Sequence, residues 1–194
     1  VSSKCLSFEG EKFEGGITRF RMKYGIFWAS SRYPGYEKDI QDVHPTMAAG
    51  YGAFNRKKFL ELGGYDDLYL PGRLEDNDLC FRAWKKGWVL LYEPGSVIFH
   101  KGGVAFHTRF GEWGTLRINH RNSFLFVWKN IRDPIFLLSH VFLLPLRLIF
   151  AVLKGQTEFV MGFLDALPRL GETLRRRAHL PASELSDRQI FSRV

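Results

Sequence analysis

The sequence predicts an α/β fold followed by a helical C-terminal segment that associates with a membrane. Between residues 48 and 133, short runs rich in β-branched and aromatic residues alternate with helical patterns. Residues 134–153 form a long apolar run, and 194 residues are enough for about one domain with an appendage. We therefore divide the chain into an α/β part at 1–133, a membrane-associating helical part at 134–180 and a polar tail at 181–194.

Composition narrows the kinds of partner. The chain is 45% hydrophobic and 25% charged, which excludes a disordered or collagen-like polymer. A net charge of +8 favours an anionic partner such as a lipid surface or a phosphorylated substrate. We expect no nucleic acid, because basic and aromatic residues do not gather on one element. Cys5 and Cys80 are too few and too far apart for a disulfide framework or a zinc site, and they fit a reducing compartment.

Local patterns place the elements of the first part in order. Residues 1–47 show turn signals and few strong periods, so we expect loops with a strand or two. The sequence then predicts a small-residue strand at 48–54, a helix at 56–62 that Asn55 caps and Gly63-Gly64 ends, and a helix at 75–86 that stops at Gly87. A strand–turn–strand unit follows, with strands at 88–92 and 96–99 around Glu93-Pro94-Gly95.

The helix at 75–86 has one apolar face that includes a carboxylate. Positions 76, 79, 80, 83 and 84 follow the spacing of one helical face, and all are apolar except Asp76. The opposite face is polar and expected to face solvent, with Asp78 and Arg82 spaced as an i,i+4 ion pair. Asp76 is therefore either a capping group or a working acid or base.

Residues 48–130 contain an ordered series of motifs. The series consists of Gly50-Tyr51-Gly52-Ala53-Phe54-Asn55-Arg56, Leu62-Gly63-Gly64-Tyr65-Asp66, Leu74-Glu75-Asp76-Asn77-Asp78-Leu79-Cys80-Phe81-Arg82, Tyr92-Glu93-Pro94 and Val97-Ile98-Phe99-His100-Lys101. In this order and spacing it resembles the acceptor-side half of a family 2 glycosyltransferase, similar to bacterial rhamnosyltransferases that build cell-surface polysaccharide. The resemblance implies the C-terminal part of a GT-A, Rossmann-like fold.

The resemblance also implies an inverting transfer of a sugar from a nucleotide diphosphate sugar to a lipid-linked or polysaccharide acceptor. Such a transfer needs a base to take the proton of the attacking hydroxyl, and the family motif matches Asp76, with Glu75 beside it. A helix N-terminus favours an ionised carboxylate. The alternative is that both carboxylates only complement the helix dipole.

Further substrate-binding residues follow from the same resemblance: Gly50, Gly52, Tyr65, Asp66, Asp78 and Arg121. The two glycines would line the floor of the acceptor cleft, or else mark a tight crossing of strands. The aromatic loop that begins at Tyr65 would shape the acceptor pocket, or else pack in the core. Arg121 would neutralise a phosphate group, or else form a salt bridge on a helix surface.

His100 is the candidate metal ligand. In similar enzymes a histidine at a comparable place joins the Mg²⁺ or Mn²⁺ that bridges the diphosphate, and the alternative is an ordinary histidine at a strand end.

The chain also departs from the family pattern. Asp76-Asn77-Asp78 spells D-x-D, but on a helix rather than at a strand end, and residues 1–47 show no strand–helix–strand start. Because Val1 opens the chain without a signal stretch, we expect a processed chain or a piece of a longer protein. Most of the donor-binding half then lies in a separate or missing N-terminal part, so this chain would not catalyse transfer alone. The alternative function is a non-catalytic membrane-surface binding module derived from a glycosyltransferase.

The second part has the features of a membrane-surface segment. Residues 134–153 are long enough to cross a bilayer, but Arg147 makes a span costly. Residues 158–174 carry an apolar face, Pro168 should kink them, and Arg175-Arg176-Arg177 follows. We favour attachment in the membrane plane, with a true span or plain packing as alternatives. This predicts a cytoplasmic protein that is peripheral to the inner face of the cell membrane, with a loosely ordered tail from Pro181.

Overall fold

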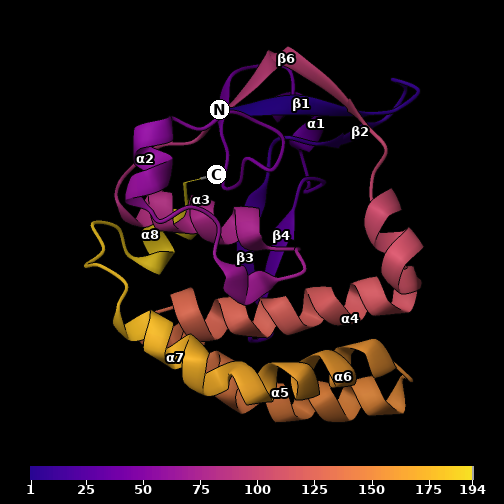
Figure 1. The fold of residues 1–194 in the computed structure, drawn as a ribbon, viewed down its shortest axis with the longest axis vertical. Coiled ribbons are helices and arrows are strands. Elements are labelled where there is room, and N and C mark those ends of the chain that lie inside the picture. Colours follow the sequence, from indigo (N-terminus) through magenta and orange to yellow (C-terminus); the bar gives the residue numbers. More distant parts are fainter. Residues whose placement is uncertain (194) are drawn as a thin grey trace.

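Two small sheets occupy the upper and central parts of the molecule (Figure 1), in a computed structural model that describes residues 1–193. The first sheet contains β1 (Ser2–Ser7), β2 (Phe13–Gly15), β5 (His44–Pro45) and β6 (Leu91–His100), in the order β2-β1-β6-β5. In it β1 and β6 run parallel, and the other neighbours are antiparallel. The second sheet is the antiparallel pair β3 (Arg19–Lys23) and β4 (Ile26–Ser30).

The prediction of loops with a strand or two at 1–47 is wrong, because this region holds five of the six strands described between residues 1 and 193. Each has six residues or fewer, which is too short for a clear period. Moreover, β1 is stabilised by pairing with β6, about ninety positions along the chain. A local pattern does not report such a distant partner. The short helix α1 (Tyr36–Asp39) also lies in this region.

The strand–turn–strand unit predicted at 88–99 is one continuous strand, β6. Its pairing with β1 passes from Ser3 opposite Glu93 directly to Lys4 opposite Val97. The three intervening residues therefore form a bulge that does not reverse the chain. The Glu93 carboxylate accepts a hydrogen bond from the Gly95 amide at 2.9 Å, which stabilises the bulge.

The predicted strand at 48–54 is also wrong. Gly52 makes only an isolated bridge with Ser2. Its backbone crosses so close to Val1 and Ser2 that a Cβ at this position would have no room. Gly52 therefore serves the tight crossing that was the alternative for this residue. The following helix, α2 (Arg56–Glu61), confirms the prediction, and its Asn55 cap accepts from the Lys58 amide at 3.1 Å.

Helix α3 (Glu75–Lys85) confirms the helix predicted at 75–86, and it follows the short 3₁₀ turn η1 (Asp67–Tyr69). The apolar face is buried as predicted: Leu79, Cys80, Ala83 and Trp84. The solvent-facing assignment is wrong for Asp78, which is 0% exposed. Cys5 and Cys80 are both buried free thiols, in agreement with the absence of a disulfide framework.

A helical layer covers the lower side of the sheets (Figure 1). It consists of α4 (Val104–Asn130), α5 (Pro134–Leu153), α6 (Thr157–Ala166), η2 (Leu167–Arg169) and α7 (Leu170–Ala178). Gly111 kinks α4 with a φ of 66°. Pro168 lies in the 3₁₀ turn between α6 and α7, so the predicted break in the amphipathic stretch is confirmed.

The tail is better ordered than predicted. Helix α8 (Asp187–Phe191) begins with a capping box formed by Ser186 and Gln189. The buried Asp187 carboxylate accepts from the backbone amides of Arg132 and Asp133, each at 2.6 Å, and pairs with Lys85. Ile190 is fully buried in the main core. These contacts hold α8 against α3, so residues 186–191 are not loosely ordered.

Candidate functional site

A cavity of about 620 Å³ opens between the two sheets and the helical layer. Residues from six regions of the chain line it: the segment between β2 and β3, β4 with Ser31, the turn at 50–51, the segment at 73–77, the segment from His100 into the start of α4, and the middle of α4. Among the predicted site residues it brings together Gly50, Glu75, Asp76 and His100. The positions of these four residues in the sequence do not by themselves indicate that they line the same cavity.

The start of α3 is shaped by an unusual backbone. Arg73 and Leu74 both have left-handed conformations, with φ of 74° and 66°, which L-residues other than glycine rarely adopt. Helix α4 holds this segment in place through Asn122, whose side-chain amide donates to the carbonyls of Tyr69, Gly72 and Arg73 at 2.7–3.0 Å. The strained segment thereby directs the first turn of α3 into the cavity, and strain of this kind gathers at functional sites.

Asp76 is a half-buried carboxyl in the first turn of α3. Its Oδ1 accepts from the Asn77 amide at 2.8 Å. Burial raises the pKa of Asp76, and the backbone hydrogen bonds and Arg73 oppose the rise only in part. A carboxylate with a raised pKa is a stronger proton acceptor than an exposed one.

Gly50 leaves the room that this carboxylate occupies. A Cβ at position 50 would lie 2.5 Å from Asp76 Oδ2, closer than any real Cβ contact. Gly50 therefore leaves room for Asp76, because a side chain at position 50 would push the carboxylate aside. The group that approaches the Gly50 backbone closely is this carboxylate.

Glu75 brings a second carboxyl to the cavity. Its Oε2 is buried, and among residues 1–193 it has no hydrogen-bond partner. Burial and the neighbouring Asp76 raise the pKa of Glu75, against the effect of backbone hydrogen bonding and Arg73. Two adjacent carboxyls with raised pKa values can accept and hold a proton within one cavity.

His100 lies at the end of β6, beside the ring of Tyr51 at 5.1 Å between centroids. Its Nδ1 is buried without a hydrogen-bond partner in the described residues, and Glu14 Oε2 lies 3.9 Å away. Within residues 1–193 no group of three histidine, cysteine or acidic side chains is arranged to hold a metal ion. The role of His100 as a ligand of Mg²⁺ or Mn²⁺ therefore stays a prediction.

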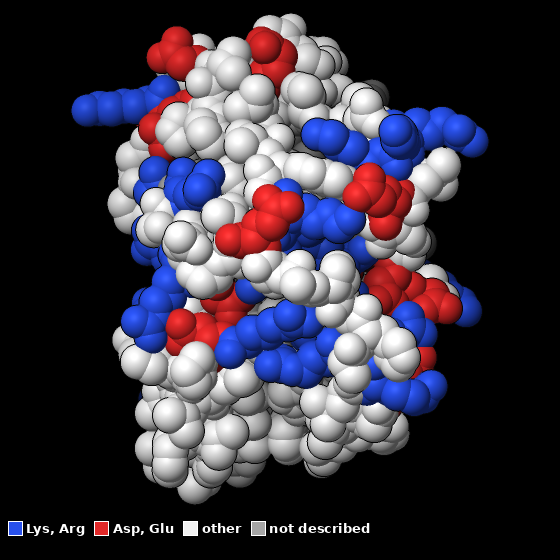
Figure 2. Space-filling model, turned by 90° about the vertical axis from the view of Figure 1, so that its left-hand side faces the viewer, with Lys and Arg blue, Asp and Glu red and all other residues white. Residues whose placement is uncertain are grey.

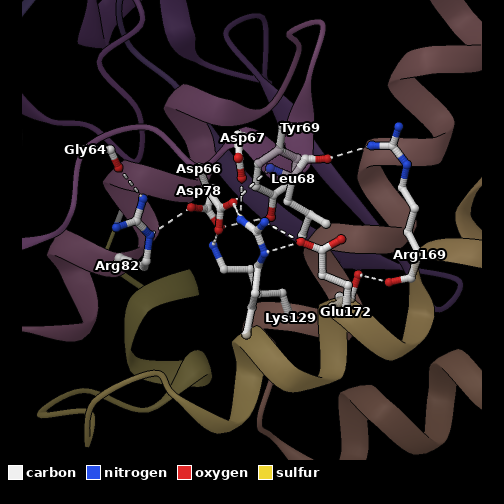
Figure 3. A network of polar contacts seen from close by, with 12 residues as sticks. Gly64, Asp66, Asp67, Leu68, Tyr69, Asp78, Arg82, Lys129, Arg169 and Glu172 are labelled. Atoms are coloured by element: carbon white, nitrogen blue, oxygen red, sulfur yellow. Dashed lines mark hydrogen bonds and ion pairs between the residues drawn. The ribbon is translucent and has the colours of Figure 1, made fainter.

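Asp78 lies outside the cavity, in a buried network of charges (Figure 3). Its carboxylate accepts from Tyr69 Oη at 2.9 Å, Lys129 Nζ at 2.7 Å, Asn130 Nδ2 at 2.7 Å and Arg82 Nε at 2.8 Å. Burial raises the pKa of Asp78, but Lys129 and Arg82 outweigh it and hold the pKa below its usual value. The predicted pair with Arg82 is confirmed, but the carboxylate has no free face for a substrate.

Asp66 belongs to the same network, where it pairs with Lys129 at 2.6 Å and with Arg176. Together with Tyr65 it lines a second cavity, of about 770 Å³, between α2, α3 and the segment after α7. The network holds Asp66 apart from Asp76, whereas Tyr65 stays close to it: burial raises the pKa of Tyr65, and the Asp76 and Glu75 carboxyls raise it further.

Arg121 is buried and lies outside both cavities. Its guanidinium donates to the Leu70 carbonyl at 2.6 Å and to Asn122 Oδ1 at 2.9 Å. Burial and the nearby Arg169 lower the pKa of Arg121 to about 10. It therefore matches neither expectation, a phosphate ligand or a surface salt bridge, and instead fixes the loop that precedes α3.

Sequence reasoning missed two residues that shape the site, Arg73 and Lys129. Arg73 lines the cavity, with its backbone held by Asn122, and Lys129 neutralises Asp66 and Asp78. Lys129 had one available signal, since a lysine in an otherwise apolar stretch of helix usually has a buried partner. Arg73 had none, because its role depends on contacts between distant segments.

Comparison with known proteins supports a relationship to glycosyltransferases. No protein-family profile matches the chain. It is 30% identical to N-acetylgalactosaminyltransferase 7 of Drosophila melanogaster over 102 residues, which cover 48% of this chain and 17% of that protein. It is 41% identical to the probable N-acetylgalactosaminyltransferase 9 of Caenorhabditis elegans over 56 residues, 29% of this chain and 10% of that protein. The chain thus spans a small part of each relative and is similar to glycosyltransferases in that part.

Proposed function

We propose that this chain forms the acceptor-side part of a glycosyltransferase that moves a sugar from a nucleotide diphosphate sugar to an acceptor hydroxyl with inversion. The observation that carries the proposal is the cavity in which Glu75 and Asp76 meet Gly50 and His100. The partial similarity to two N-acetylgalactosaminyltransferases supports glycosyl transfer. Family 2, a GT-A fold and a lipid-linked or polysaccharide acceptor are the finer parts of this proposal.

In the proposed reaction, Asp76 removes the proton from the acceptor hydroxyl. The acceptor oxygen then attacks the anomeric carbon, the bond from that carbon to the diphosphate oxygen breaks, and the nucleoside diphosphate leaves with the bonding pair. Burial raises the pKa of Asp76 and so favours proton uptake. Glu75 lies beside it with a free Oε2, which can accept a hydrogen bond from a second acceptor hydroxyl.

We also propose that residues other than 1–194 supply most of the donor-binding half. The chain covers only 17% and 10% of its two relatives, and its described residues hold no complete metal site. A requirement for Mg²⁺ or Mn²⁺ stays a prediction, and no step above depends on a metal.

The exposed face of α5 supports attachment to a membrane surface. Nine apolar side chains of this helix are exposed: Ile135, Leu138, Val141, Phe142, Leu146, Ile149, Phe150, Val152 and Leu153. Residues 134–153 form the single helix among residues 1–193 that is long and apolar enough to cross a membrane, and 11% of its most apolar stretch is buried. On the face shown in Figure 2, Lys and Arg gather above an uncharged lower end, the end at which Figure 1 places α5.

Two polar side chains of α5, His140 and Arg147, contact the rest of the protein. His140 Nδ1 lies 2.5 Å from the Gly25 carbonyl, and Trp128 Nε1 donates to His140 Nε2 at 3.0 Å. The Arg147 guanidinium lies 5.1 Å from the ring centroid of Phe159 on α6. With both polar groups held against the protein, α5 presents an apolar face to lipid without leaving the fold, which favours in-plane attachment at the cytoplasmic face over a span.

The test of the proposed function is sugar transfer by the natural protein that contains these residues. Uridine, guanosine and thymidine diphosphate sugars are offered with lipid-linked and polysaccharide acceptors. We expect Asp76→Asn to lower kcat by about 10²–10⁴-fold and the exposed Asp42→Asn to leave it unchanged. Equal rates for the two variants, or retention at the anomeric carbon by NMR, would overturn the role of Asp76 as base. Vesicle binding with no transfer under any condition would instead favour the non-catalytic membrane module.

A further inference from the structure

Arg73 presents an unpaired guanidinium to the candidate site. Within residues 1–193 no carboxylate lies at ion-pair distance from it, whereas several other arginines pair: Arg19, Arg82, Arg117, Arg176 and Arg188. Its Nε is buried and has no hydrogen-bond partner in the described part of the chain. A buried donor of a charged group is costly to leave unsatisfied, so this side chain is arranged to meet an acceptor that the protein does not supply.

The neighbouring structure holds the guanidinium in position. It lies over the ring of Phe106 at 5.0 Å from the centroid. A Cβ at Gly72 would lie 2.9 Å from the same ring, so the preceding backbone also packs closely on Phe106. The Arg73 backbone is fixed as well, because Asn122 donates to the Arg73 carbonyl at 2.7 Å. Arg73 is therefore positioned before any ligand arrives.

The surroundings of Arg73 indicate the charge of its ligand. Lys101, an exposed cation, lines the same cavity. The Glu75 and Asp76 carboxyls line it too, and Arg73 lies close enough to oppose the rise that burial causes in their pKa values. The guanidinium is a planar fork of donors that matches phosphate oxygens. Because the described residues hold no complete metal site, Arg73 is a cation that this chain itself can offer to such oxygens.

We propose that Arg73 binds the diphosphate of a ligand in this cavity. Naming the diphosphate as that of the nucleotide sugar rests on the proposed function. The same chemistry occurs in an isoprenyl diphosphate acceptor, so the two sources must be distinguished by experiment. In either case Arg73 is a binding residue that neutralises the diphosphate beside the proposed base.

The test is calorimetric titration of the 194-residue chain with inorganic pyrophosphate, uridine diphosphate and farnesyl diphosphate, in the presence of EDTA. We expect Arg73→Gln to weaken pyrophosphate binding by roughly tenfold to a hundredfold, as for the loss of one or two charge-assisted hydrogen bonds. Arg73→Lys should recover part of the loss, because it restores the charge without the fork. The matched control is Arg56→Gln, which removes the same charge from the exposed start of α2.

Two results would overturn the inference: no pyrophosphate binding by the wild-type chain at millimolar concentration, or equal weakening by Arg73→Gln and Arg56→Gln. Tighter binding of uridine diphosphate than of farnesyl diphosphate identifies the donor as the source, and the reverse identifies the acceptor. Circular dichroism spectra and thermal midpoints establish that each variant is folded. Arg73-dependent pyrophosphate binding without sugar transfer by the natural protein would refute the proposed function and leave the diphosphate site intact. Sugar transfer that is unaffected by Arg73→Gln would refute the role of Arg73 in binding diphosphate and leave the proposed function intact.

Discussion

Two carboxylates that lie two positions apart on α3 should respond in opposite ways to replacement by asparagine. Asp78→Asn removes the charge that faces Lys129 at 2.7 Å and Arg82 at 2.8 Å. Removing one partner of a buried ion pair costs about 3–5 kcal/mol. We expect the lower end, about 3 kcal/mol, because Lys129 keeps Asp66 at 2.6 Å and Arg82 keeps the Gly64 carbonyl at 2.8 Å.

For a chain of this size, about 3 kcal/mol corresponds to a fall in thermal midpoint of roughly 6–12 °C. Asp76→Asn should leave the midpoint unchanged or raise it at neutral pH, because it removes a carboxylate whose ionised form is disfavoured by burial. Thermal and urea unfolding of both variants, followed by circular dichroism, measures the difference. A midpoint for Asp78→Asn at or above that of Asp76→Asn would refute the distinction between a structural and a functional carboxylate.

The pH dependence gives this comparison a second readout. The pKa of Asp78 is lowered from 3.8, so its contribution to the free energy of unfolding is present above pH 3.8 and is lost as the pH falls through the folded-state pKa. The pKa of Asp76 is raised from 3.8, so its contribution is present below pH 3.8 and is lost as the pH rises through the folded-state pKa. The penalty of Asp78→Asn should therefore shrink in acid, while any benefit of Asp76→Asn should appear only above pH 3.8.

Two further predictions concern the cavity and α5. Gly50→Ala should lower transfer at least about tenfold through displacement of Asp76 while changing the thermal midpoint little, since the clash at 2.5 Å is with the end of a side chain; an unchanged rate would contradict the close packing of these two groups. Phe142→Glu with Leu146→Glu should abolish co-sedimentation with anionic vesicles, because both side chains lie on the exposed face of α5 and a buried charge is costly in lipid. The control is Leu60→Glu, another exposed apolar position, on α2, and equal loss in the control would argue against α5 as the membrane surface.

Helices α2, α3 and α5 could be predicted from the sequence because their signals are local, whereas the long helix α4 was not predicted. Asn55 and Gly63 bound α2 as expected, and the apolar run at 134–153 coincides with α5. The sheet could not be predicted, since β1 pairs with β6 and the bulge in β6 depends on that pairing. A turn signal such as Glu93-Pro94-Gly95 reverses the chain only when no distant strand holds both flanks.

The candidate site shows the same division between local and distant information. The place of Asp76 in the first turn of α3 is a local property, but the backbone that directs this turn into the cavity is held by Asn122 of α4. Asp78 appears solvent-facing on a helical wheel, but Lys129 and Asn130 of α4 reach it at 2.7 Å each and turn that face into a buried one. Arg121 and Asn122 likewise act on a loop about fifty positions away, so neither could be assigned from its own neighbours.

The two faces of α3 thus divide two tasks between similar carboxyl groups. On one face, Lys129 and Arg82 neutralise Asp78 and fix α3 against α4, which leaves Asp78 ionised and its oxygens occupied. On the other face, the absence of a side chain at Gly50 and the left-handed backbone at Arg73 and Leu74 leave room beside Asp76. A carboxyl that is buried but not neutralised by an ion pair takes up a proton at higher pH than one that is fully paired. The paired Asp78 anchors the helix, and the rigidity that this gives to α3 keeps Asp76 in place to accept a proton.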